Sequence, residues 1–198
     1  MSDVIAQFNF IKNKVSKNST TIADLESKII KTSKSINFLN NFVEYTRSQI
    51  KGKIEDIVNS ALKCVFIDKS LLFKIVPNIT KRGVNYDMYI DTNGNLTPLL
   101  DCKGGGVLDI ITLSIRIAFL RMFSSHLRQT LILDEPFKNL DADRISPACE
   151  WLRLISKEFE IQFIMVSHIQ ELIDGSDKVF QVSLEDNISK VEVIKCQL

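Results

Sequence analysis

The sequence predicts an α/β fold with a parallel βαβ core, antiparallel β additions and a long coiled-coil helix in front. Three observations lead to this prediction. Apolar residues recur at every seventh position from Phe8 to Ile57. Two short apolar runs flank a helical pattern at residues 144–159, and segments of alternating polarity lie on both sides of this core. We therefore expect a coiled-coil arm over residues 1–62 and a globular lobe over residues 63–198.

The heptad repeat is carried by one series of positions, whose members are all apolar. They are Phe8, Val15, Ile22, Ile29, Ile36, Val43, Ile50 and Ile57. A repeat of this length indicates a helix supercoiled around another helix, and β-branched residues in the series favour a two-stranded coil. The partner helix is then another chain or the arm folded back on itself. The alternative is a helix packed on its own globular domain.

Residues 18–21, Asn-Ser-Thr-Thr, form the weakest helical stretch of the arm. These residue types favour caps and turns over helix interiors. The sequence is compatible with a break capped by Thr20 or Thr21, or with a turn that would fold the arm into a helical hairpin.

The lobe is expected to begin near Cys64 with a small antiparallel sheet. Residues 71–76 read as a strand, residues 86–91 alternate in polarity, and Asn93-Gly94 gives a tight-turn signal between strands. The tail alternates on both sides of residues 185–187, which predicts a closing hairpin.

The predicted core follows from residue 107 onward. Residues 107–127 are apolar at helical spacing. Residues 130–134 and 161–167 are continuous apolar runs, and they lie on either side of the amphipathic stretch 144–159. This order predicts two buried parallel strands joined by a crossover helix and covered on both faces.

Composition limits the classes of function. The chain has 198 residues, 45% of them hydrophobic, and a formal net charge of +1, so its total charge indicates no particular polyanion as a ligand. The four cysteines form no CxxC pair, which argues against a structural zinc site. No apolar run approaches the roughly 18 residues needed to cross a bilayer. We expect a cytoplasmic protein that does not contact membranes.

The first candidate site residues are Asp134 and Glu135, which directly follow the apolar run at residues 131–133. Sites in parallel sheets lie beyond the carboxyl ends of the strands. One carboxylate there can hold the water shell of Mg²⁺, and its neighbour can accept a proton from a water that attacks a phosphoryl group. The alternative is an ordinary acidic strand terminus.

Three further features support a phosphate site. His168 follows the second apolar run, where an imidazole could contact a γ-phosphate or hold the attacking water. Lys103 and the glycines 104–106 precede the helical pattern, so their backbone N–H groups could bind an anion. The alternative for the glycines is a flexible turn. Asn139-Leu140-Asp141, just past Pro136, is a weak signal alone.

Together these motifs resemble a known family. LILDEP at residues 131–136, NLD at residues 139–141 and VSH at residues 166–168 resemble the C-terminal half of ABC-type ATPases, with the glycine triplet as the signature motif. The heptad arm narrows the resemblance to SMC proteins and SbcC-type DNA double-strand-break repair ATPases. The implied fold is an ABC-ATPase-like half-head.

The resemblance also implies roles for individual residues. Asp134, at the end of the Walker B strand, would support Mg²⁺, and Glu135 would be the catalytic base. Asp141 would be the D-loop acid and His168 the switch histidine. The loop formed by Lys103, Gly104, Gly105 and Gly106 would contact the γ-phosphate of ATP held by an opposing head.

Two departures from the family pattern decide the expected partners. The signature serine is missing whether it aligns with Lys103 or with Gly104, and no G-x-x-x-x-G-K-[ST] loop occurs in the sequence. The chain is therefore expected to use ATP and Mg²⁺ only with a partner, either a Walker A-bearing ATPase half or a full-length SMC-like ATPase, bound through the coiled coil and the head. An SbcD-type nuclease would be a further partner, and DNA would be contacted indirectly.

Three readings of such a half-head are open. The first is a split DNA-repair ATPase that hydrolyses ATP with its partner and is inactive alone. The second is a non-catalytic module that docks on a full-length ATPase and regulates it. The third is a truncated product, whose unpaired strand edges would expose apolar surface and favour aggregation.

Overall fold

The structure, a computed structural model, describes residues 2–80, 83–102, 104–123 and 127–196. It divides into two compact units, Met1–Ile50 and Lys51–Leu198. Ile54, Val58 and Leu62, near the end of the expected arm, are buried in the core of the second unit. The boundary after residue 62 stays a prediction. None of the described helices carries an apolar stretch long enough to cross a membrane.

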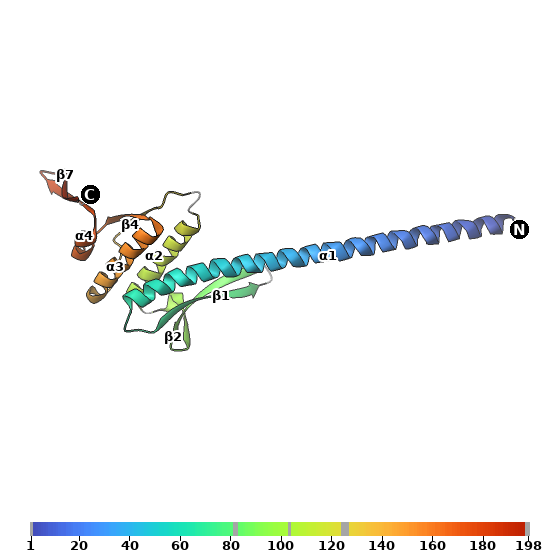
Figure 1. Cartoon of the computed structure of the whole chain (residues 1–198), viewed down its shortest axis with the longest axis horizontal. Helices are drawn as coiled ribbons and strands as arrows, with labels where there is room; N and C mark the ends of the chain where they lie inside the picture. Colours follow the sequence, from blue (N-terminus) through green and yellow to red (C-terminus); the bar gives the residue numbers. More distant parts are fainter. Residues whose placement is uncertain (1, 81–82, 103, 124–126, 197–198) are drawn as a thin grey trace. The chain divides into compact units, whose positions relative to one another are not determined.

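Helix α1 (Ser2–Val65) is continuous, which confirms the long N-terminal helix (Figure 1). At the weak stretch, the hydroxyl groups of Thr20 and Thr21 both donate hydrogen bonds to the carbonyl oxygen of Lys17, at 2.8 and 2.9 Å. The alternatives of a break or a turn at this stretch are wrong, because the hydroxyls bond back to the helix and leave its backbone ladder intact.

The heptad series of the first unit lies on the surface of α1. Its members from Phe8 to Val43 are 41–65% exposed. An apolar stripe of this length on a helix needs a second surface to cover it. Pairing of the stripe with another helix stays a prediction.

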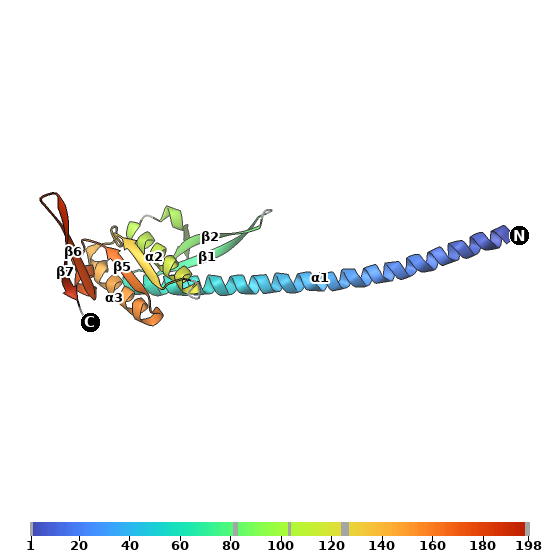
Figure 2. The ribbon, with the colours of Figure 1, turned by 90° about the horizontal axis from the view of Figure 1, so that it is seen from above.

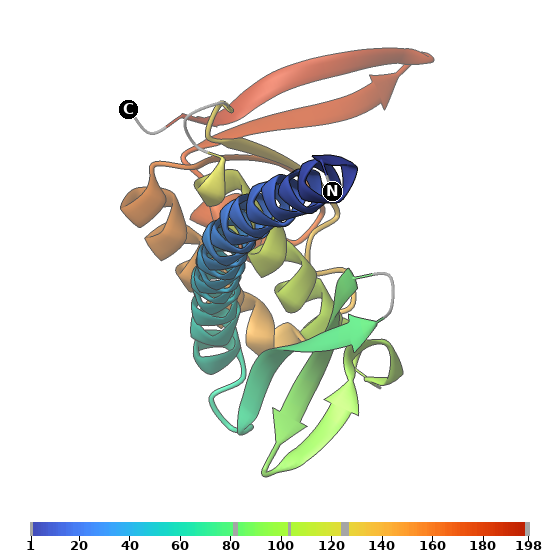
Figure 3. The ribbon, with the colours of Figure 1, turned by 90° about the vertical axis from the view of Figure 1, so that its right-hand side faces the viewer.

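The antiparallel sheet forms as predicted, with strands β1 (Leu71–Thr80), β2 (Gly83–Thr92) and β3 (Asn95–Pro98) in the order β1-β2-β3 (Figure 3). Asn93 and Gly94 join β2 to β3 with φ angles of +54° and +91°. Two successive positive φ values are what a type I′ turn requires, so the Asn-Gly signal is confirmed. A short 3₁₀ turn, η1 (Leu99–Asp101), follows β3.

Side chains of α1 cover the outer edge of β1. The amide group of Asn59 donates to the Phe73 carbonyl oxygen (3.1 Å) and accepts from the Phe73 N–H (2.7 Å). Glu55 accepts from the Ile75 N–H at 2.6 Å. These contacts, which we call the clamped edge, satisfy backbone groups that an edge strand otherwise leaves unpaired.

The parallel core is also confirmed. Helix α2 (Gly105–Met122) precedes β4 (Thr130–Asp134), and α3 (Ala142–Phe159) connects β4 to β5 (Gln162–Val166). The two strands pair in parallel, with Leu133 opposite Met165. Leu133 and the residues on its side of the sheet pack into a core shared with buried residues of α2 and α3.

The opposite side of this sheet is uncovered. Ile132 is 75% exposed, Ile164 47% and Val166 62%, and we call these three residues the open face. The prediction that both faces are covered is therefore wrong for this chain. Alternating burial along β4 and β5 shows the reason: the core packs against one face only, and none of the described elements covers the other.

The chain ends in a hairpin, as predicted. After the short helix α4 (Gln170–Gly175), which the sequence did not reveal, β6 (Lys178–Glu185) pairs antiparallel with β7 (Ile188–Cys196) (Figure 2). Cross-strand neighbours share a side of the hairpin, and one side carries a set of exposed apolar residues. They are Phe180, Val182, Leu184, Val191 and Val193.

Candidate functional site

The acidic pair lies at the carboxyl end of β4. Asp134 is the last strand residue and is exposed. The Glu135 N–H still donates to the Val166 carbonyl oxygen at 2.8 Å, but Glu135 has a φ of +46° and Phe137 a φ of +71°. Left-handed backbone is costly for residues other than glycine. Phe137, only 2% exposed, holds this sharp turn in place from the core.

The structure brings Glu135 and His168 together. Nδ1 of His168 lies 3.1 Å from Oε1 of Glu135. The contact arises because β4 and β5 are parallel neighbours, so that the residues following them meet at one edge of the sheet. Since a carboxylate only accepts hydrogen bonds, the imidazole donates from Nδ1. The His168 side chain is 78% exposed, so the rest of its ring faces solvent.

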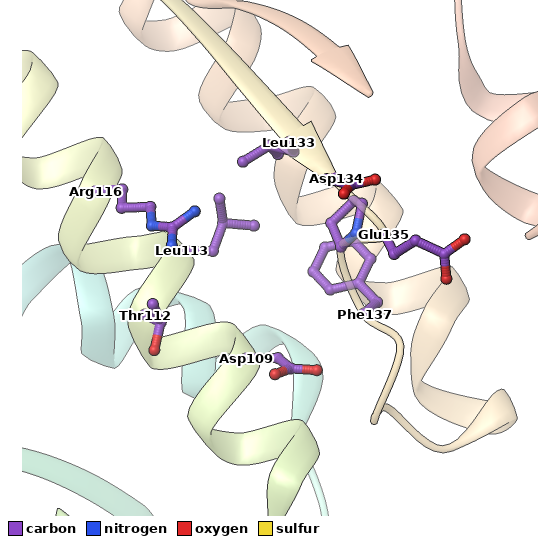
Figure 4. A pocket seen from close by; sticks show the side chains of 9 residues that line it. Asp109, Thr112, Leu113, Arg116, Leu133, Asp134, Glu135 and Phe137 are labelled. Carbon is purple, nitrogen blue, oxygen red and sulfur yellow. The ribbon is translucent and has the colours of Figure 1, made fainter. Parts of the chain in front are cut away.

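A polar cavity of about 190 Å³ separates α2 from the end of β4. Asp109, Thr112 and Arg116 of α2 line one side of it, and Figure 4 shows Arg116 reaching from the helix toward β4. The acidic pair lines the other side of the cavity. A guanidinium group therefore shares this cavity with Asp134 and Glu135.

The glycine triplet opens α2, as its sequence suggests. Gly104 is the N-cap, and Gly105 and Gly106 form the first helical turn. A Cβ on Gly105 would lie 2.9 Å from Cβ of Asn139, and one on Gly106 would lie 2.9 Å from the Asn139 carbonyl oxygen. The last two glycines therefore permit close packing of the helix on residues 139–140. Lys103, predicted with them as part of the anion site, lies outside the described residues.

Asp141 occupies the N-cap position of α3, but its side chain makes no capping hydrogen bond. Its Oδ2 atom lies 3.6 Å from Nε of Arg144, and the side chain is 76% exposed. Its neighbour Asn139 is held more firmly: the Asn139 N–H donates to Oδ2 of Asp109 (3.1 Å) and its side-chain amide donates to Oδ1 (3.3 Å).

Arg144 links this part of the site to the end of α1. Its guanidinium donates two hydrogen bonds to Asp68, at 2.7 and 2.9 Å, and lies 4.9 Å from the ring centre of Phe66. The hydrogen bonds from Arg144 lower the pKa of the Asp68 carboxyl from 3.8 to about 2. The charged pair thereby attaches the start of α3 to the segment that follows α1.

The sequence interpretation missed three residues of the site, Asp109, Thr112 and Arg116. A signal for them was present, because they lie three and seven positions apart on the predicted helix and so share one helical face. Among the described residues no group of three or more His, Cys, Asp or Glu is placed to hold a metal ion.

Comparison with known proteins finds relatives among DNA double-strand break repair ATPases. No family model matches the chain. It is 30% identical over 160 residues to the DNA double-strand break repair Rad50 ATPase of Sulfolobus acidocaldarius, covering 80% of this chain and 16% of the relative. Identity to the Rad50 ATPase of Methanocaldococcus jannaschii is 29% over 155 residues, which are 78% of this chain and 14% of the relative.

The chain also shares its fold with solved SMC heads. The structure of the Smc head domain with a coiled coil and joint from Pyrococcus yayanosii matches with a TM-score of 0.64 and 16% identity. The match covers 91% of this chain and 33% of that one. The chain spans only a small part of the length of the curated relatives that it matches. By its sequence the chain is a partial head of the Rad50/SMC family, and its fold is that of an SMC head.

Proposed function

We propose that this chain is the C-terminal half of a DNA double-strand-break repair and recombination ATPase. In this proposal it hydrolyses ATP only with a partner that supplies the Walker A loop, and it is inactive alone. One observation carries the proposal: Glu135 and His168 lie 3.1 Å apart where two parallel strands end. A carboxylate and an imidazole in this position suit hydrolysis of a phosphoanhydride.

In this proposal each side chain has a role that is compatible with its position. Glu135 would accept a proton from the attacking water, and His168, which contacts the Glu135 carboxylate through Nδ1, would have Nε2 available for the γ-phosphate. Asp134, exposed beside them, supports Mg²⁺. A single carboxylate fits Mg²⁺, which usually keeps several waters and takes other ligands from the nucleotide.

Binding of ATP requires more phosphate contacts than the described residues supply. The backbone N–H groups of the first turn of α2, at Gly104 to Gly106, fit an anion because a helix N-terminus carries unpaired donors and partial positive charge. The sequence contains no phosphate loop. The β- and γ-phosphates and the remaining Mg²⁺ ligands are therefore assigned to a partner.

The open face supports the proposal that a partner carrying the Walker A loop binds this chain. Ile132, Ile164 and Val166 form an exposed apolar surface directly behind the strand ends that carry the acidic pair and the imidazole. Exposed apolar strands of this kind mark interaction surfaces. We infer that the Walker A-bearing half covers this face and that its helix pairs with the apolar stripe of α1. A nuclease of the SbcD type and DNA are reached through the assembled complex, in the cytoplasm.

A second function is favoured by a different observation. The glycine triplet lacks the serine of the family signature, and the sequence lacks the phosphate loop. Both absences suit a non-catalytic module that docks on a full-length SMC-like ATPase and regulates it. In that case the chain would bind the complete enzyme and lower its turnover.

Two measurements test the proposal. Isothermal titration of ATP and Mg²⁺ into the chain alone should show no binding tighter than about millimolar, because most triphosphate contacts are absent. The chain is then co-expressed with candidate Walker A-bearing proteins, starting with those encoded beside it, and ATP turnover of each purified complex is compared with that of its parts. Turnover only in a complex supports the split ATPase. If no partner yields turnover, the proposal is rejected, and loss of a complete ATPase's activity supports the regulatory module.

The binding surface has its own control. Ile164→Asp, on the open face, should abolish co-purification of the partner. Ile79→Asp, at an apolar position on β1 that is more exposed than Ile164 (83% against 47%), should leave it unchanged. Equal effects of the two substitutions would exclude the open face as the specific interface.

A further inference from the structure

The cavity contains one carboxylate, that of Asp109, to which the proposed reaction assigns no role. Asp109, half-buried on α2, accepts two hydrogen bonds from Asn139, one from its backbone N–H (3.1 Å) and one from its side-chain amide (3.3 Å). The two residues are 30 positions apart in the sequence. Hydrogen bonds to an ionised acceptor are stronger than those between neutral groups.

The glycines beside Asp109 bring the same two segments into contact. A Cβ on Gly106 would lie 2.9 Å from the Asn139 carbonyl oxygen and 3.1 Å from Cα of Leu140. Backbone atoms cannot move aside as a flexible side chain can. The first turn of α2 and residues 139–140 thus meet backbone to backbone, with the Asp109 carboxylate joining them.

The segment held by this contact is the one that carries Glu135. It begins where the Glu135 N–H bonds to the Val166 carbonyl oxygen (2.8 Å) and continues through the left-handed Phe137, whose carbonyl oxygen accepts from the Leu140 N–H (3.0 Å). Asp109 is the side chain on α2 that hydrogen-bonds this turn. A displacement of α2 would therefore reach Glu135 through a short and strained connection.

We propose that Asp109 is a positioning residue that couples the glycine turn of α2 to the turn carrying Glu135. Its carboxylate holds Asn139, so that the anion-binding end of α2 and the proposed base move as one unit. The functional part of this inference rests on the proposed ATPase activity. The coupling itself can be measured without it.

The first experiment uses the chain alone. Amide hydrogen exchange at Asn139, followed by NMR, should be about tenfold faster in Asp109→Ala, because the amide loses its charged acceptor. Asp109→Asn keeps one acceptor oxygen and should show a smaller increase. The Phe73 amide, held by Asn59, is the internal reference and should not change. Unchanged exchange at Asn139 in Asp109→Ala would overturn the coupling.

The second experiment uses the active complex. Asp109→Ala should lower kcat for ATP about tenfold while KM stays within about twofold, because Asp109 positions the base and does not contact the nucleotide. Asp109→Asn should lie between the two, and Asp101→Ala, an exposed carboxylate on η1, should behave as wild type. An unchanged kcat, or a loss confined to KM, would reject the functional role. If the wild-type complex shows no turnover, the proposed function fails, and the exchange measurement still decides the coupling.

Discussion

The clamped edge and the open face belong to the same lobe but are treated in opposite ways. At the clamped edge, Asn59 and Glu55 of α1 satisfy the outward backbone groups of β1. At the open face, Ile132 and its neighbours are left to solvent. The chain covers the edge of the β1-β2-β3 sheet with its own helix. It leaves one face of the β4-β5 sheet, whose strand ends carry Glu135 and His168, exposed to solvent. The open face and the proposed catalytic groups therefore belong to the same two strands.

The largest expected difference lies between two adjacent residues of β4. Leu133→Ala should lower the free energy of unfolding by about 2–5 kcal/mol, because it empties a buried site that is only 4% exposed. Ile132→Ala, at a position that is 75% exposed, should change it by less than about 0.5 kcal/mol. Denaturant unfolding of the isolated chain measures both. Similar losses would mean that the open face is covered in the isolated chain.

The clamped edge can be broken at one residue. Asn59→Ala should lower the free energy of unfolding by about 2–3 kcal/mol, because both the N–H and the carbonyl of Phe73 lose their partner. Asn85→Ala, at an exposed position on β2, is the matched control and should cost less than about 0.5 kcal/mol. A loss no greater than that of the control would show that water replaces the clamp without penalty.

For the glycine turn beside the site, the close packing predicts the sign of a change in stability. Gly106→Ala should destabilise the chain by about 1–3 kcal/mol, because its Cβ would overlap the backbone of residues 139–140. In an unobstructed helix the same change would stabilise by up to about 1 kcal/mol. Gly104→Ala, which meets only the side chain of Val107, should stay within about 0.5 kcal/mol of wild type in thermal or denaturant unfolding. A stabilising Gly106→Ala would contradict the close packing.

The smallest effect is the pH dependence of the Asp68–Arg144 pair. The folded-state pKa of Asp68 is lowered to about 2 from 3.8, so the pair stabilises the fold above the unfolded-state pKa and loses its contribution as the pH falls through the folded-state pKa. Asp68→Asn should therefore lose less stability than wild type between about pH 4 and about pH 2.

Salt sharpens this measurement. The Asp68 side chain is 59% exposed, so solvent screening keeps the effect small, and about 1 M salt should reduce the difference between the two proteins further. Identical pH profiles of wild type and Asp68→Asn at low salt would show that the pair does not stabilise the fold.

Much of the fold could be predicted because it depends on local pattern. The heptad series specifies a long helix, Asn93-Gly94 a tight turn, and the two apolar runs a parallel pair of strands. The meeting of Glu135 and His168 followed from that pairing, since parallel neighbours end at the same edge. The geometry of the pair is thus encoded in the order of the elements.

The remaining features depend on contacts that the pattern does not contain. The apolar run at residues 131–133 reads the same whether its outer side is covered by this chain or by another, so the open face could not be foreseen. The contact between Asp109 and Asn139 joins residues far apart in sequence. Continuity of α1 through Thr20 and Thr21 depends on hydroxyl groups bonding to the preceding turn rather than capping a new helix.

The measurement that decides the account is ATP turnover by the complex of this chain with its Walker A-bearing partner, with Glu135→Gln compared with wild type. Glutamine keeps the size of the side chain and an oxygen that accepts from His168 but cannot take the proton. The account predicts a fall in kcat of about 10²–10⁴-fold, while Glu160→Gln, beyond the end of α3, retains full activity. Wild-type turnover in the Glu135→Gln complex would contradict the assignment of Glu135 as the base.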